Sequence, residues 1–213
     1  SVTQTIKTML EILDIEEQNV DIDDIHAYQI QEYLFLLDLI MKVDIQHIPK
    51  GNQLNHKIII CQPGLRYAQA QAFIKALMMD KKFNDLSIQE RTMVQKRALG
   101  AIKGRMIEDQ ILLETKVAIR HKHVFQLQFA IGEFDMVIQD EETLTCEIFE
   151  IKLSDKIVPL QIQHLINEEK CAITEHYFGR IVGKYVIYSG KPTIYNGITY
   201  LNIETYLKSL GKI

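Results

Sequence analysis

Three successive segments of the chain alternate apolar and polar residues, and this period of two restricts the fold more than any other feature. The segments run from 124 to 131, from 133 to 139 and from 144 to 152. Successive side chains of a strand point to opposite faces of a sheet, so such alternation predicts β-strands. The links, Gly132 and the acidic stretch 140–143, are too short to hold a helix. The sequence therefore predicts an antiparallel meander.

Helical patterns surround this meander. A long helical stretch begins near Ser87, where Ser87 and Glu90 have the spacing of a capping box, and continues to about Arg120. After the meander we expect a helix over about 158–175, a strand over 184–188 and a capped terminal helix over 202–210. With 213 residues, 47% of them hydrophobic, the chain can bury a sizeable core. The expected class is α/β or α+β.

The N-terminal part has a different layout. Helical patterns near 6–13 and over 25–42 precede two strand-like segments, 43–48 and 57–61, which are separated by a turn. Helices followed by a hairpin are typical of a winged helix. We therefore predict a winged-helix domain over 1–64, a helical connector over 65–95 and the meander-containing domain over 96–213.

Two acids and a lysine on neighbouring strands are the strongest chemical signal. Glu150 and Lys152 are two residues apart on one predicted strand, so they project from the same face. Asp135 lies on the strand before. Carboxylate oxygens suit a hard cation such as Mg²⁺ or Mn²⁺, and a neighbouring ammonium can stabilise developing negative charge. Asp135 and Glu150 are therefore the predicted metal ligands, with Lys152 as a catalytic partner.

A helical acid is expected to complete this site. Glu108 is our preferred candidate, and Glu114 is the alternative, six residues further along and on a different face of the helix. We expect Glu133 and Glu147 to face solvent or the opposite side of the sheet. His121 and His123, two residues apart at the predicted helix end, could contact phosphate, but we read them as part of a solvated helix C-terminus.

The segments Gly132-Glu-Phe-Asp135 and Glu150-Ile-Lys152 resemble the D…E-x-K signature of the PD-(D/E)XK nuclease superfamily. The order of elements over about 105–190 resembles it too. The resemblance implies a restriction-endonuclease-like mixed sheet flanked by helices and metal-dependent hydrolysis of a phosphodiester. Some nucleases of this superfamily use a Gln on the following helix, where Gln161 and Gln163 both occur.

More narrowly, the chain resembles the C-terminal region of a family of prokaryotic AAA+ ATP-binding proteins, in which a winged helix precedes a nuclease-like domain. Four segments carry this resemblance: 23–37, Gln62-Pro-Gly-Leu-Arg-Tyr67, Gly104-Arg-Met-Ile-Glu108 and 179–190. The sequence contains no G-x-x-x-x-G-K-[ST] motif. The resemblance therefore implies that ATP is bound only by an upstream domain, outside this chain.

Charge is distributed unevenly along the chain. Residues 1–58 hold four lysines and ten acidic residues, a balance of −6 that disfavours DNA binding by the winged helix and favours an upstream ATPase domain or a protein partner. Between Lys96 and Lys122, seven basic residues face three acids, a balance of +4. We read this stretch as a candidate nucleic-acid contact; a solvated helix face is the alternative.

Cysteine usage and hydropathy set the expected location. The three cysteines are widely spaced and include no C-x-x-C pair, which disfavours a disulfide framework or a zinc site. No apolar run is long enough for a membrane span. We expect a cytoplasmic protein with no membrane partner. Two functions remain open: a metal-dependent nuclease, or a non-catalytic interaction module that retains a degenerate nuclease fold.

Overall fold

The structure, a computed structural model, describes residues 23–49, 55–79, 83 and 85–211. The chain forms two compact units: the first contains the chain up to Ile40 together with Gln62–Ile102, and the second contains Met41–Cys61 and the chain from Lys103 onward. The helix expected near residues 6–13 lies outside the described residues.

Helices build the described part of the first unit. They are α2 (Asp24–Leu36), α3 (Pro63–Met79) and the beginning of α5 (Ile88–Ala118). The predicted capping box is present at the start of α5, where the Ser87 backbone N–H donates to Glu90 Oε2 over 2.9 Å. The long helix predicted from the sequence is therefore confirmed.

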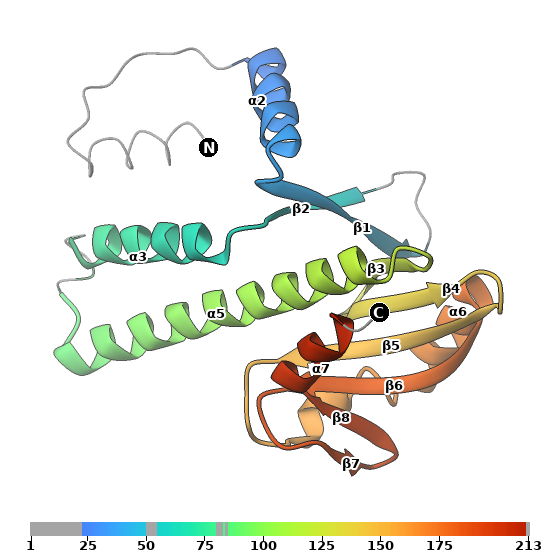
Figure 1. Ribbon diagram of the computed structural model, residues 1–213. Coiled ribbons are helices and arrows are strands. Elements are labelled where there is room, and N and C mark those ends of the chain that lie inside the picture. The colour runs from blue at the N-terminus through green and yellow to red at the C-terminus, as the bar shows by residue number, and fades with distance from the viewer. Residues whose placement is uncertain (1–22, 50–54, 80–82, 84, 212–213) are drawn as a thin grey trace. The chain divides into compact units, whose positions relative to one another are not determined.

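The second unit is built on one eight-stranded mixed sheet, which confirms the predicted α/β class (Figure 1). The strands follow the order β2-β1-β3-β4-β5-β6-β8-β7. Their bounds are β1 (Ile40–Ile48), β2 (Asn55–Ile60), β3 (His123–Phe129), β4 (Glu133–Asp140), β5 (Thr145–Lys152), β6 (Arg180–Tyr188), β7 (Thr193–Tyr195) and β8 (Ile198–Asn202).

Strand pairing confirms the predicted meander. β3 pairs with β4 and β4 pairs with β5, both antiparallel, whereas β6 runs parallel to β5. β1, which we had assigned to the winged helix, pairs in parallel with β3, with Asp44 opposite Phe125. The predicted strands 43–48 and 57–61 therefore exist, but they extend the sheet of the second unit.

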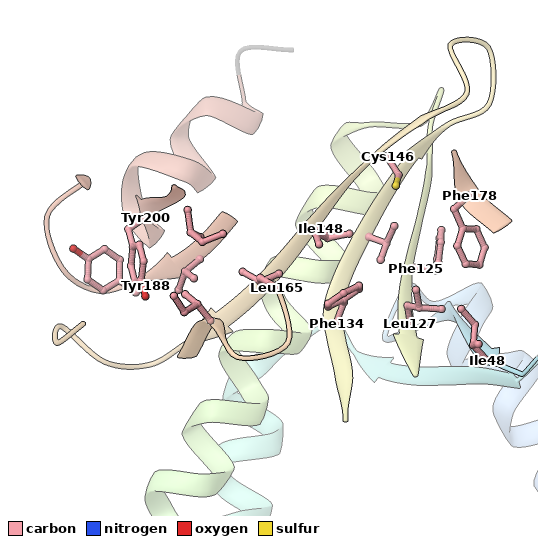
Figure 2. Packing of buried hydrophobic residues seen from close by; sticks show 14 residues of the cluster. Ile48, Phe125, Leu127, Phe134, Cys146, Ile148, Leu165, Phe178, Tyr188 and Tyr200 are labelled. Carbon is pink, nitrogen blue, oxygen red and sulfur yellow. The ribbon is translucent and has the colours of Figure 1, made fainter. Parts of the chain in front are cut away.

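Two apolar layers cover the sheet. On one face, residues of β3, β4 and β5 pack with Leu165 and with Phe178 of α6 (Glu168–Phe178) (Figure 2). On the other face, Ile111 and Leu112 of α5 pack with Phe149 and Ile151 of β5, and α7 (Ile203–Leu210) adds to this layer. Helices thus flank both faces of the sheet, as burial of apolar strand residues on both sides requires.

The structure differs from the sequence prediction between β5 and β6. We expected one helix over about 158–175, whereas the chain forms a 3₁₀ turn, Pro159–Ile162, and then α6 (Glu168–Phe178). Asn167 caps α6, because its side chain accepts a hydrogen bond from the Lys170 backbone N–H over 2.9 Å. This cap sets the later start of the helix, and the intervening turns carry His164.

Candidate metal and phosphate site

The three predicted residues Asp135, Glu150 and Lys152 meet at one end of the meander. Met136 of β4 lies opposite Phe149 of β5, so one further step of this antiparallel register brings Asp135 opposite Glu150. Lys152 Nζ lies 2.9 Å from Asp135 Oδ2 and 2.7 Å from Glu150 Oε2. One ammonium group therefore joins the two carboxylates.

Asp135 is held in place by the strand beside it. Its Oδ2 accepts the Ile151 backbone N–H over 2.7 Å in addition to the Lys152 ammonium. Only 7% of the Asp135 surface is exposed. Two hydrogen bonds on a buried oxygen fix the carboxylate in orientation, which suits a group that must present its other oxygen to a ligand.

Glu150 is the most unusual group of the site. It is 3% exposed, and its Oε1 accepts no hydrogen bond from any residue that the structure describes. Burial first and the nearby Asp135 carboxylate second raise the pKa of Glu150 to about 8, against the opposing effect of the Lys152 ammonium. Burial lowers the pKa of Lys152, but the two carboxylates outweigh this effect and raise it overall.

Glu108 reaches the same pocket from α5. Burial raises the pKa of Glu108 to about 7, and the Asp135 carboxylate acts in the same direction, whereas Lys152 and Arg105 oppose it. Glu114, the alternative, is exposed and accepts a hydrogen bond from Gln110 over 2.6 Å. Among the two helical acids, only Glu108 contributes to the pocket.

These groups line a pocket of about 420 Å³, which we call the acid pocket. Its lining residues are Arg105, Glu108, Gln128, Phe129, Gly132, Glu133, Asp135, Glu150, Lys152 and His164. The pocket collects four acids and three groups that can carry positive charge. Such a mixture suits a cation together with an anionic ligand.

Sequence reasoning missed three ionisable residues of the lining, Glu133, Arg105 and His164. Glu133, expected to face solvent or the opposite side, is half-buried in the pocket and accepts hydrogen bonds from Gln126 over 2.7 Å and Gln128 over 3.3 Å. Gln126 and Gln128 occupy alternate positions of β3, and these two polar side chains on one face of the strand were the sequence signal that could have placed Glu133 in the pocket. Arg105 was noted only as part of a basic stretch, and His164 lies in turns where no periodicity marks it.

The two candidate glutamines do not line the acid pocket. Gln161 is buried and binds the backbone around it, accepting from Val158 N–H over 3.0 Å and donating to Lys156 O over 2.9 Å. Gln163 is exposed, and its amide nitrogen lies 3.4 Å from His164 Nε2. Gln161 therefore stabilises the loop after β5.

The donor set fits a hard divalent cation. Asp135, Glu150 and Glu108 supply carboxylate oxygens, and the buried Glu150 Oε1 is an acceptor for which the described residues provide no donor. In the present side-chain positions, no three His, Cys, Asp or Glu residues of the described ranges converge as a ligand group. Binding of a cation would thus require the Lys152 ammonium to move away from at least one carboxylate.

Some lysines of the basic stretch between Lys96 and Lys122 already form ion pairs with acidic residues. Lys116 lies 3.7 Å from Asp44 and Lys122 lies 3.2 Å from Asp140. His123, which we expected at a solvated helix end, instead begins β3 and lies 3.0 Å from Asp44 through its Nε2. Arg105 is the member of this stretch that lines the acid pocket.

Comparison with models of protein families, with curated proteins and with solved structures found no match to the chain. Over the described residues, no helix combines the length and the apolar character that a bilayer crossing requires. The cysteines Cys61, Cys146 and Cys171 are not joined by disulfides. The functional argument therefore rests on the chemistry of the acid pocket.

Proposed function

We propose that the second unit is a metal-dependent phosphodiesterase of the PD-(D/E)XK nuclease type. The observation that carries this proposal is the meeting of Asp135, Glu150 and Lys152 in one pocket, with a buried Glu150 oxygen for which the described residues offer no donor. Ionisation of both buried acids beside a single ammonium would create an excess of negative charge, which a bound cation would offset.

Each residue has a role in this mechanism. Asp135 and Glu150 would hold Mg²⁺ or Mn²⁺, with Glu108 completing the shell. The cation, when bound, supplies Lewis acidity and lowers the pKa of a coordinated water. Lys152, released from one carboxylate, would stabilise the negative charge that develops on the phosphoryl oxygens. Arg105, at the exposed rim, would contact the phosphate backbone.

Metal binding is the direct test. Titration of Mn²⁺ by calorimetry should show saturable binding, and metal at about 100 times its Kd should stabilise the protein by about 2.7 kcal/mol. Asp135→Ala should abolish both effects, whereas Glu142→Ala, in the exposed turn after β4, should change neither. Hydrolysis of single- and double-stranded DNA and RNA in Mg²⁺ or Mn²⁺ should follow the same pattern. Failure of wild-type protein to bind Mn²⁺ would refute the proposal.

A non-catalytic interaction module is the second candidate. It is favoured by the present pairing, in which the Lys152 ammonium satisfies both carboxylates and no three ligands of the described residues converge. This candidate predicts no Mn²⁺ binding and a loss of stability in Asp135→Ala at all Mn²⁺ concentrations. The calorimetric titration therefore separates the two functions.

We also propose that the chain is related to the C-terminal region of prokaryotic AAA+ ATP-binding proteins and acts in the cytoplasm. A protein partner or an upstream ATPase domain for the acidic N-terminal region is supported by α2, which has no buried residue and exposes Tyr28, Tyr33 and Leu36. The three cysteines without disulfides suit a reducing compartment. The parent reading frame is expected to encode a glycine-rich phosphate-binding loop upstream, and a parent without one would refute the relationship.

A further inference from the structure

A second pocket adjoins the acid pocket on the same unit, and no role has yet been given to it. It has a volume of about 600 Å³ and shares Phe129 and His164 with the acid pocket. Its other lining residues include the apolar Ile48, Pro49, Ile131 and Ile173 and the polar or charged Lys170, Asn167, Gln163 and Glu169. Apolar side chains together with a cationic group suit a nucleotide, which has apolar base faces and an anionic phosphate.

Lys170 is an ammonium held by neutral acceptors. Its Nζ donates to the Ile131 carbonyl over 2.7 Å, lies 2.8 Å from His164 Nδ1 and stands 4.9 Å from the centre of the Phe129 ring. No carboxylate of the described residues lies within ion-pair distance of it. An ammonium has three hydrogens, so these two acceptors leave one hydrogen for a ligand, while the charge of Lys170 is attracted only from a distance by Glu150.

His164 is oriented by this contact. Because Nδ1 faces a Lys170 ammonium that can only donate, the imidazole carries its hydrogen on Nε2. Nε2 lies 3.4 Å from the exposed Gln163 amide nitrogen, a long contact between two nitrogen atoms that leaves the imidazole hydrogen available. His164 therefore presents an N–H donor at the border between the two pockets.

Gly132 makes this arrangement fit. A Cβ at position 132 would lie 2.6 Å from His164 Cε1 and 3.0 Å from Lys170 Nζ. Gly132 also has φ +79°, which glycine adopts at little cost. The turn that places Asp135 in the acid pocket is thus shaped around the His164–Lys170 pair.

We propose that His164 and Lys170 form a phosphate-binding subsite for single-stranded nucleic acid, next to the phosphodiester at the acid pocket. The His164 Nε2–H and the Lys170 ammonium bind the neighbouring phosphate, while Phe129 and Pro49 contact the base. The subsite rests on the proposed nuclease function and extends it by naming the substrate class. Glu169 is exposed at the rim, and the acids of the acid pocket, which shares His164, also lie near a phosphate bound there.

The test uses the full chain and a short fluorescein-labelled oligothymidylate, with binding followed by anisotropy in CaCl₂. Lys170→Gln should weaken binding by roughly tenfold or more, since charge-assisted hydrogen bonds are worth that much. The slope of log affinity against log salt should also fall by about 0.7, the share of one phosphate contact on a single strand. Lys191→Gln, at an exposed position after β6, is the matched control and should change neither.

Three further results decide the proposal. Lys170→Arg should retain most of the affinity and Lys170→Gln should keep the melting temperature within about 2 °C, which separates phosphate binding from folding. If wild-type protein binds Mn²⁺ and Lys170→Gln matches Lys191→Gln, the subsite is refuted while the nuclease proposal stands. If wild-type protein binds duplex more tightly than oligothymidylate, the single-stranded assignment is wrong. Absence of both Mn²⁺ and oligonucleotide binding refutes the two proposals together.

Discussion

Replacing Glu150 with Gln should change how the stability of the protein depends on pH. The pKa of Glu150 is raised to about 8 from an ordinary value of 4.5, chiefly because the carboxyl is buried and lies beside Asp135. The folded protein therefore holds this proton more tightly than the unfolded chain does. Stability from this group is complete below about pH 4.5 and is lost as pH rises through about 8.

The size of the effect follows from the two pKa values. Each pH unit between them is worth about 1.4 kcal/mol, so the loss from acidic to alkaline pH is about 5 kcal/mol for a group that is 3% exposed. Gln keeps the shape of Glu and offers Lys152 an amide oxygen in place of the carboxylate, but it has no proton to lose. Glu150→Gln should therefore not show this decrease in unfolding free energy between acidic and alkaline pH.

The free energy of unfolding of wild type and of Glu150→Gln is measured by urea denaturation without divalent ions, at about pH 5, 7 and 9 and constant ionic strength. The other titrating groups are common to them, so the difference in unfolding free energy isolates Glu150. Glu142→Gln, in the exposed turn, should follow wild type at every pH. If Glu150→Gln runs parallel to wild type from about pH 5 to about pH 9, Glu150 is not a carboxyl held protonated by burial, and the account of the acid pocket is wrong.

Three other predictions test the surrounding structure. Mn²⁺ affinity measured by calorimetry should rise roughly fiftyfold between about pH 6 and 7 and level off above about 8, since protons on Glu150 and Glu108, with pKa values of about 8 and about 7, compete with the metal; a pH-independent affinity would contradict this. Gly132→Ala should cost more than about 1 kcal/mol in urea unfolding, because of its positive φ and the close His164 ring, whereas Gly64→Ala, with open space in α3, should be neutral or stabilising. Lys57→Met should destabilise the protein by up to about 3–5 kcal/mol, because it removes the Lys57 ammonium from its ion pair with the buried Asp109 carboxylate. The double variant with Asp109→Leu should recover most of this loss of stability in thermal unfolding. If the effects of the two substitutions on stability simply add, Lys57 and Asp109 are not coupled and the prediction is wrong.

The alternation of residues predicted the meander and the meeting of Asp135 with Glu150, because two adjacent antiparallel strands with a short link have essentially one register. It did not predict that β1 pairs with β3. A period of two tells which side chains are buried but not which distant strand is the neighbour, and residues 43–48 fit a local hairpin equally well. The short strands β7 and β8 offer too few residues for a pattern, and His164 lies in turns without one.

In the acid pocket, the observed side chains depart from the usual preference for apolar residues at buried strand positions. Glu150 occupies a strand position that is 3% exposed, between the buried residues Phe149 and Ile151, where an apolar side chain would suit the packing. Exchanging a buried ion pair for apolar residues is often neutral or stabilising, so stability alone gives no reason for two buried acids around one lysine. A conflict of this kind between local preference and fold is expected at functional sites. A ligand that brings positive charge would offset the repulsion between these carboxylates, which is the role that the proposed function gives to a divalent cation.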